Sequence, residues 1–314
     1  MKTEAEFGAT VAPLRGALRL HCYRMLGSAS DGDDMVQETL LRAWRARDTL
    51  QDPGRLRPWL YRIATNVCLD ELARRPRRGL ASDVFEPVPG DSYPPAAPIE
   101  AGWLEPMPDA WLAGVSQDPE ARYLLRESVA LAFIAALQVL TPPQRAALLL
   151  CDVIGMSAGE VATTLDQSVA ATHSVLHRAR DVIEAKVAVE RGTALAPEAE
   201  SVMQRYVRAI AEADVEAMIA IIHDDMHTTM PPSPTWIRGL ADSIVFYRRM
   251  FARWSAGQVT LVPIGVNGGL GCEFHRDGVL RAIEALEVRD GKLARMHHFM
   301  QPGVVSLFAT ATAG

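Results

Sequence analysis

One predicted helix of this 314-residue sequence carries, on its outward face, side chains suited to reading nucleic acid. If Val169, Leu176 and Ile183 form its buried stripe, small and hydrogen-bonding residues face outward. These are Ala170, Ala171, Ser174, His177, Arg178 and Asp181. Side chains of this kind can approach base edges and phosphates in a DNA groove. The alternative is a helical hairpin packed in a larger helical domain, which the zero net charge of residues 122–191 favours.

A basic run, Arg74-Arg75-Pro76-Arg77-Arg78, ends a helix that is expected to begin near Pro58. Together with Arg55, Arg57 and Arg62, the run could neutralise the phosphates of a nucleic acid. Because the C-terminus of a helix itself favours cations, stabilisation of the helix dipole explains the run about equally well.

Acidic side chains gather at the start of an earlier helix, which Ser30 is expected to cap. They are Asp31, Asp33, Asp34 and Glu38. Such a cluster could dock on a basic protein, or it could bind a metal ion. Its spacing, however, lacks the pattern of a metal-binding loop. A structural interpretation also stands, since the helix dipole stabilises acids in the first turn.

Acid–base or metal chemistry in the last third of the chain would fall to a small set of residues. They are His223, Asp224, Asp225, His227, His297 and His298. Their spacing matches no zinc signature, and adjacent residues of a strand such as His297 and His298 point to opposite faces. We therefore expect these side chains to line a pocket or the surface rather than to catalyse. Met230 and Trp236 are expected in a core or a pocket wall.

Capping signals and helical periodicity predict the elements that carry the outward-facing residues. The segment Leu124–Val139 reads as an apolar helix, and Thr141–Gln144 and Ser157–Glu160 are capping boxes that open two more. After the turn Asp166–Ser168, a longer helix extends to about Val187. A short helix, a three-residue turn and a longer helix match a helix-turn-helix.

From Pro197 onward the pattern changes to that of an α+β domain. Residues 201–222 predict two helices. Four β-rich runs follow, over residues 258–266, 270–274, 280–289 and 292–299. Asp290-Gly291 between the last two predicts a two-residue hairpin turn, and the runs together predict an antiparallel meander.

The formal net charge of −6 argues against a nucleic-acid binder, but the charge is segregated. Residues 79–121 hold eight acidic and no basic side chains, whereas residues 1–78 hold 14 basic and 10 acidic ones. Eight prolines between Asp83 and Pro119 exclude a continuous helix or a central strand, which predicts a linker. Two tryptophans within it indicate that part of the linker docks onto a surface.

Several classes of protein are disfavoured by what the sequence lacks. The four cysteines lie far apart, the longest apolar stretch is too short for a bilayer, and the first residues form no apolar signal core. We therefore expect a cytoplasmic protein without a membrane span, disulfide framework, metal site or cofactor.

Six strings together resemble the sigma-70 family of extracytoplasmic-function (ECF) sigma factors, in the right order and spacing. Asp31–Trp44, Arg57–Asn66 and Asp70–Leu72 resemble region 2; Leu140–Arg145, Ile154–Val161 and Val175–Arg180 resemble region 4. The last domain is similar to the SnoaL-like domain of some ECF sigma factors, through Val207–Ala209, Thr229–Pro234 and Trp236–Gly239. The linker string Trp103–Asp109 also resembles one found in these long members, whereas Asn267–Gly271 departs from their glycine-rich string.

The resemblance implies roles for the residues that match. The residues that would dock on the clamp helices of the RNA polymerase β′ subunit are Asp31, Asp33, Asp34, Gln37 and Glu38. The loop Asp48–Arg57 would capture an unstacked base, and the −10 element would be bound by Arg57, Trp59, Arg62, Thr65, Asn66, Arg74, Arg75, Arg77 and Arg78. The −35 element would be read by Ser168, Ala170, Ala171, Ser174, His177 and Arg178. A ligand pocket in the last domain would include His227, Met230, Trp236 and His298.

The sequence thus predicts a multidomain protein that initiates transcription and catalyses nothing itself. Its expected parts are an all-α region 2 (1–80), a Pro-rich acidic linker (81–122), an all-α region 4 with its helix-turn-helix (123–190), and a regulatory α+β cone of helices on a curved antiparallel sheet (198–314). The expected partners are core polymerase, promoter DNA and a small ligand of the last domain. Two alternatives stay open: a small-molecule-converting SnoaL-like enzyme with a helical tether, and a stand-alone helix-turn-helix regulator.

Overall fold

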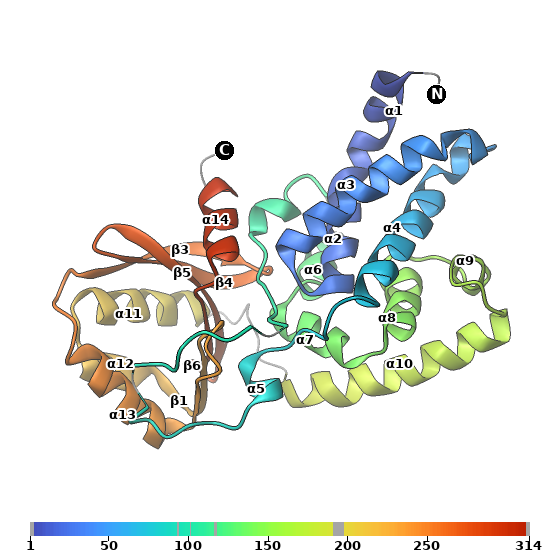
Figure 1. The fold of residues 1–314 in the computed structure, drawn as a ribbon. Helices are drawn as coiled ribbons and strands as arrows, with labels where there is room; N and C mark the ends of the chain where they lie inside the picture. Colours follow the sequence, from blue (N-terminus) through green and yellow to red (C-terminus); the bar gives the residue numbers. More distant parts are fainter. Residues whose placement is uncertain (1–2, 93, 101, 116–117, 191–197, 312–314) are drawn as a thin grey trace. The chain divides into compact units, whose positions relative to one another are not determined.

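The computed structural model describes residues 3–92, 94–100, 102–115, 118–190 and 198–311. These residues form two compact units, one within residues 1–78 and 111–190 and the other within residues 79–110 and 191–314. Figure 1 shows that the first unit is helical and that the second combines helices with one sheet. The division differs from the four segments expected from the sequence, because both sigma-like regions fall in one unit and most of the linker falls in the other.

The described residues of the helical unit form nine α-helices. They are α1 (Glu4–Val11), α2 (Arg15–Leu26), α3 (Ala29–Arg45), α4 (Leu56–Leu72), α6 (Pro119–Glu127), α7 (Leu131–Val139), α8 (Pro142–Leu148), α9 (Ala158–Thr164) and α10 (Val169–Glu190). The capping boxes expected at Thr141 and Ser157 open α8 and α9. The turn between α9 and α10 then completes the helix-turn-helix that the sequence predicts.

Three local expectations for this unit were wrong. The cap of α3 is Ser28 rather than Ser30, because the extended Ser28 places its hydroxyl to accept from the Asp31 amide. The apolar segment Leu124–Val139 is two helices, α6 and α7, rather than one. Val169 is 46% exposed because it is the first residue of α10, and the buried stripe of that helix is Thr172, Leu176 and Ala179.

The second unit contains a six-stranded sheet in the order β2-β1-β6-β5-β4-β3. Its strands are β1 (Ile222–Thr229), β2 (Trp236–Arg238), β3 (Val259–Val266), β4 (Gly269–Arg276), β5 (Val279–Arg289) and β6 (Lys292–Phe299). Asp290 and Gly291 have φ angles of 53° and 67°, as the expected two-residue hairpin turn requires. The sheet is mixed rather than wholly antiparallel, because β1 pairs with β6 in parallel.

Helices pack on this sheet around an apolar core. They are α11 (Ala199–Ala211), α12 (Val215–Ile221), α13 (Leu240–Phe251) and α14 (Pro302–Ala311), and a short α5 (Ala81–Val84) lies in the linker. Tyr206 of α11 and Phe246 and Tyr247 of α13 are buried in one cluster with the apolar side chains of the sheet. The helices thereby cover the sheet as the α+β prediction requires.

The described residues of the linker segment 79–110 belong to this second unit, and Figure 1 draws them as a thin teal coil with the short helix α5. The Val88 amide donates to the Trp236 carbonyl at 3.0 Å, and the indole nitrogen of Trp236 donates to the Phe85 carbonyl at 2.7 Å. Trp103 and Trp236 share a small apolar cluster. The expectation that part of the linker docks is therefore confirmed.

Across the described ranges, no helix has both the length and the apolar character needed to cross a membrane.

Candidate nucleic-acid interface

The outward face of α10 is accessible as the sequence predicts. Ser168, Ala170, Ser174, His177 and Arg178 are exposed, and Ala171 is half-buried. The Ser168 hydroxyl accepts from the Ala171 amide at 3.1 Å, which fixes the first turn of the helix. Five of the six residues predicted for the −35 element thus lie on α10, and Ser168 immediately precedes it.

Helix α4 presents three of its predicted DNA residues, Arg57 among them, and hides another. Arg62 and Asn66, one turn apart, are exposed, and Trp59 is half-buried. Thr65 is 0% exposed, and its hydroxyl lies 2.9 Å from the Nε2 atom of His21. The predicted DNA contact by Thr65 is corrected accordingly: it belongs to the apolar stripe that packs α4 on α2.

The loop between α3 and α4 borders a cavity of about 440 Å³. Its region 2 side is lined by Thr49, Leu50, Gln51, Asp52, Arg55, Pro58, Trp59 and Arg62. Met156 and three residues of α9, Glu160, Thr163 and Thr164, form the opposite wall. Arg57 donates to the Ile154 carbonyl at 3.2 Å. In this conformation the loop expected to capture a base is therefore walled by the first helix of the helix-turn-helix.

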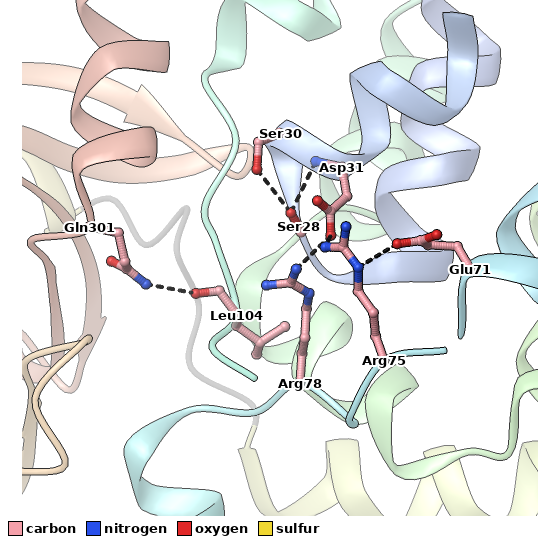
Figure 2. Close-up of polar contacts among 8 residues, drawn as sticks. All are labelled: Ser28, Ser30, Asp31, Glu71, Arg75, Arg78, Leu104 and Gln301. Atoms are coloured by element: carbon pink, nitrogen blue, oxygen red, sulfur yellow. Dashed lines mark hydrogen bonds and ion pairs between the residues drawn. The ribbon is translucent and has the colours of Figure 1, made fainter. Parts of the chain in front are cut away.

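The basic run after α4 is partly neutralised within its own unit, as Figure 2 shows. Asp31 accepts from Arg75 at 2.7 Å and from Arg78 at 2.5 Å, and Arg75 also pairs with Glu71. In this conformation Asp31 therefore pairs with two arginines of the basic run. Arg74 and Arg77 are exposed and form no ion pair with the described residues.

The remaining acidic residues of α3 differ in what they contact. Asp34 and Gln37 are exposed, whereas Asp33 lies 3.9 Å from Arg19. Glu38 accepts from Arg42 at 2.7 Å, and hydrogen bonds with Asp70 and Glu38 raise the pKa of Arg42. On this face, Asp34 and Gln37 are thus exposed polar side chains that form no ion pair with the described residues.

Two buried arginines hold the halves of the helical unit together. Arg24 of α2 is 3% exposed and donates to the carbonyl and hydroxyl of Ser128 at 2.9 and 2.6 Å. Arg145 of α8 is 2% exposed and donates to carbonyls of its own region and to the Met25 carbonyl of α2. Burial lowers the pKa of each guanidinium to about 10, so both stay charged at neutral pH.

The C-terminal unit holds a cavity of about 480 Å³ between its helices and its sheet. Met230 and His298 line it, as predicted. His227 and Trp236 do not: Trp236 packs with Trp103 of the linker, and His227 lies 3.4 Å from Asp225. The Trp236 side chain, which the sequence predicted in the pocket wall, thus packs against the linker instead.

His297 and His298 point to opposite faces of β6, as expected for neighbours in a strand. His297 is buried with its Nδ1 atom 2.8 Å from the Thr229 hydroxyl, and burial lowers its pKa to about 3. His298 instead contacts Glu284 at 2.9 Å. Among the described residues, no cluster of three or more His, Cys, Asp or Glu could hold a metal ion.

Family models match three parts of the chain. Sigma-70 region 2 matches residues 11–78, Sigma-70 region 4 matches residues 130–182, and the SnoaL-like domain matches residues 203–296. The ECF RNA polymerase sigma factor SigG of Mycobacterium tuberculosis is 37% identical over 297 residues, which cover 93% of this chain and 80% of SigG. The chain belongs to the ECF RNA polymerase sigma factors.

A second relative agrees in sequence and in fold. The ECF sigma factor SigJ of M. tuberculosis is 28% identical over 307 residues, covering 91% of this chain and 90% of SigJ. The crystal structure of SigJ matches with a TM-score of 0.63 at 26% identity, covering 97% of this chain and 98% of that one. The fold of this sigma factor, two helical sigma regions followed by a SnoaL-like domain, is therefore that of SigJ.

In this sigma factor, the string Trp103–Asp109 docks on the hairpin between β3 and β4. The Met107 amide donates to the Asn267 side-chain oxygen, and the Asn267 amide donates back to the Met107 carbonyl, both at 3.0 Å. The Gly268 amide donates to Asp109 at 2.6 Å. Nearby, Gln301 donates to the Leu104 carbonyl, drawn in Figure 2. Asn267 therefore takes part directly in holding the linker.

Replacing Gly265 by Ala is expected to loosen this docked segment. A Cβ at Gly265 would lie 2.8 Å from the Cβ of Asp109, closer than real carbon contacts, so Asp109 must move. Loss of a charge-assisted hydrogen bond costs about 1.5–3 kcal/mol, so amide exchange over residues 105–109 should quicken at least tenfold. Hydrogen–deuterium exchange measures this. Gly303→Ala, with open space around it, is the matched control, and equal exchange in both variants would contradict the expectation.

Acid is expected to destabilise region 2 through His21. Burial, then the charge of Arg24, lowers the pKa of His21 to about 3 in the folded state. Because the unfolded chain binds this proton near pH 6.5, stability is full above that pH and falls as pH drops toward 3, by about 2 kcal/mol between pH 7.5 and 5. Urea unfolding at both pH values tests this, and the wild-type difference should shrink by that amount in His21→Gln. An unchanged difference would refute the assignment.

Proposed function

We propose that this sigma factor directs RNA polymerase core to promoters, with α4 and its preceding loop reading the −10 element and α10 reading the −35 element. The observation that carries the proposal is the exposure of both helical faces in one chain: Arg62 and Asn66 on α4, and Ser174, His177 and Arg178 on α10. Exposed arginines can bind phosphates or guanine, and Asn is suited to adenine. The matching sigma regions support the same assignment.

On this proposal, regions 2 and 4 separate when promoter DNA is bound. The two elements lie about 25 base pairs apart, or ~85 Å along the helix axis. A compact unit of this size has a radius of gyration of only about 15 Å. The bonds from Arg24 to Ser128 and from Arg145 to Met25 join regions 2 and 4 and would have to break. We propose that binding to core polymerase supplies the free energy needed to break these bonds.

Core polymerase would bind the exposed part of the α3 face, and the SnoaL-like domain would regulate rather than catalyse. Asp34 and Gln37 support the first assignment, because they are polar, exposed and not engaged in ion pairs among the described residues. The linker that joins regions 2 and 4 docks on the SnoaL-like unit, and this contact supports the regulatory role. Through it, the SnoaL-like domain directly contacts the segment that joins the two regions.

Co-purification with core polymerase tests the α3 assignment. Asp34→Lys with Gln37→Lys should weaken retention of core at least tenfold, because two like charges would face a basic partner. Asp224→Lys, a charge reversal at an exposed position of the SnoaL-like domain, is the matched control and should retain core. Equal retention by all three proteins would refute the assignment.

A further inference from the structure

The cavity of the SnoaL-like domain has walls suited to a flat apolar molecule. Its volume of about 480 Å³ lies within the range of small-molecule sites. The walls are largely rings and thioethers, from Tyr206, Phe246, Tyr247, Trp254, Phe274 and Met296. Aromatic faces and methionine sulfur pack well on planar apolar groups.

A buried carboxylate gives this apolar cavity a hydrogen-bond acceptor. Glu284 is 1% exposed, and it accepts from the Tyr206 hydroxyl at 2.8 Å and contacts the Nδ1 atom of His298 at 2.9 Å. Burial and the nearby Glu284 raise the pKa of Tyr206, so its hydroxyl stays a donor. Since a carboxylate can accept about four hydrogen bonds, Glu284 retains capacity for a donor on a ligand.

Cations lie among the residues that complete the cavity lining. Arg276 is half-buried and Arg281 exposed, and neither side chain pairs with a described acidic group. Asp277 and Glu284 line the same cavity, so the formal charges of these two acids and the two arginines sum to zero. The Trp254 indole nitrogen is buried without a partner. A ligand that satisfies these groups has an anionic end for the two arginines.

The linker forms part of the same cavity through Pro95. Hydrogen bonds hold the linker on both sides of this residue. The Gly90 amide donates to Asp242 and the Ala96 amide to the Thr235 hydroxyl, each at 2.8 Å, and the Ile99 amide donates to the Pro232 carbonyl at 3.0 Å. A molecule in the cavity would therefore touch the segment that joins sigma regions 2 and 4.

We propose that this cavity binds a small amphipathic acid, with a flat apolar body and a hydrogen-bond donor, and that its binding holds linker residues 88–92 and 94–99 on the SnoaL-like domain. The inference deepens the regulatory role proposed above and rests on it for its biological meaning. The ligand's acid group would pair with Arg276 and Arg281, its donor would reach Glu284, and its body would contact Pro95.

Binding of two matched probes to the full-length protein tests the site. Anilinonaphthalene sulfonate has a flat apolar body, an N–H donor and an anion, and phenylnaphthylamine is the same molecule without the anion. The sulfonate should bind one-to-one, and Arg276→Gln with Arg281→Gln should weaken it about tenfold while leaving the neutral probe unchanged, because only an ion pair is lost. Arg249→Gln, at an exposed position of α13 outside the lining, is the control. Equal weakening of both probes, or none, would overturn the site.

Limited proteolysis with a glutamyl endopeptidase tests the coupling to the linker. Cleavage after the exposed Glu100 should slow about tenfold at a probe concentration ten times Kd, since the bound state must first release the segment. Cleavage after Glu127 of region 4 should not change. Probe binding without slower cleavage at Glu100 would overturn the coupling. Neither assay contains polymerase or DNA, so their failure would leave the promoter-binding proposal to be judged separately.

Discussion

Replacing Arg145 by Met is expected to lower the free energy of unfolding of the helical unit by about 3–5 kcal/mol, because buried carbonyls lose a charged donor. The guanidinium donates to the carbonyl of Leu137 at 2.9 Å, to the side chain of Gln138 at 2.6 Å and to the carbonyl of Leu140 at 3.3 Å. It also donates to Met25 of region 2. Methionine fills much of the same volume but satisfies none of these acceptors.

Urea unfolding followed by circular dichroism measures this loss. Arg178→Met is the matched control, since Arg178 is exposed on α10, and it should change stability by less than about 0.5 kcal/mol. Arg145→Lys should fall between the two, because one ammonium group cannot reach all of the acceptors. A loss below 1 kcal/mol in Arg145→Met would contradict the role of Arg145 as the centre of this network.

Replacing Arg62 and Asn66 together by Ala is expected to reduce promoter-dependent transcription by ten- to a hundredfold or more, since each base or phosphate contact contributes about 1–3 kcal/mol. Both side chains are exposed on α4, so the folded state should keep its stability. The defect should be smaller at high salt if Arg62 contacts a phosphate, because binding of the wild type then weakens more steeply with salt than binding of the variant. Transcription from a fixed promoter at two salt concentrations measures both effects.

Arg205→Ala is the control for this pair, because Arg205 is exposed on α11 of the SnoaL-like domain. It should leave transcription within about twofold of the wild type, as expected of surface positions outside the interface. A pair variant that transcribes as well as Arg205→Ala would refute the assignment of α4 to the −10 element.

Local signals in the sequence were enough to predict the helix-turn-helix and the last hairpin. The capping boxes at Thr141 and Ser157 and the Asp290-Gly291 turn depend on neighbouring residues alone, and the structure forms them where expected. Strand β1 was missed because most of its first half, His223-Asp224-Asp225, is polar and partly exposed. Its place in the sheet comes from parallel pairing with β6, a contact between residues far apart in the chain.

The candidate site was predicted less completely, because burial depends on packing between elements. Thr65 follows Tyr61 and precedes Cys68 at helical spacing, and that stripe is the signal that could have marked it as buried. The sequence did not indicate the ion pairs of Asp31 with Arg75 and Arg78, because these arginines lie in the segment after α4, far from Asp31 in the chain. Trp236 left the predicted pocket because the linker packs on it, which no local pattern indicates.

In vitro transcription with purified core polymerase tests the central claim most directly. A set of promoter fragments that differ only in the −10 or the −35 element would be transcribed with core alone and with core plus this protein. We expect transcripts only when the protein is added and only from fragments that keep both elements, with a loss of at least tenfold when either is changed. Transcription that is independent of the added protein, or insensitive to both elements, would contradict the proposal that this chain is the promoter-reading subunit.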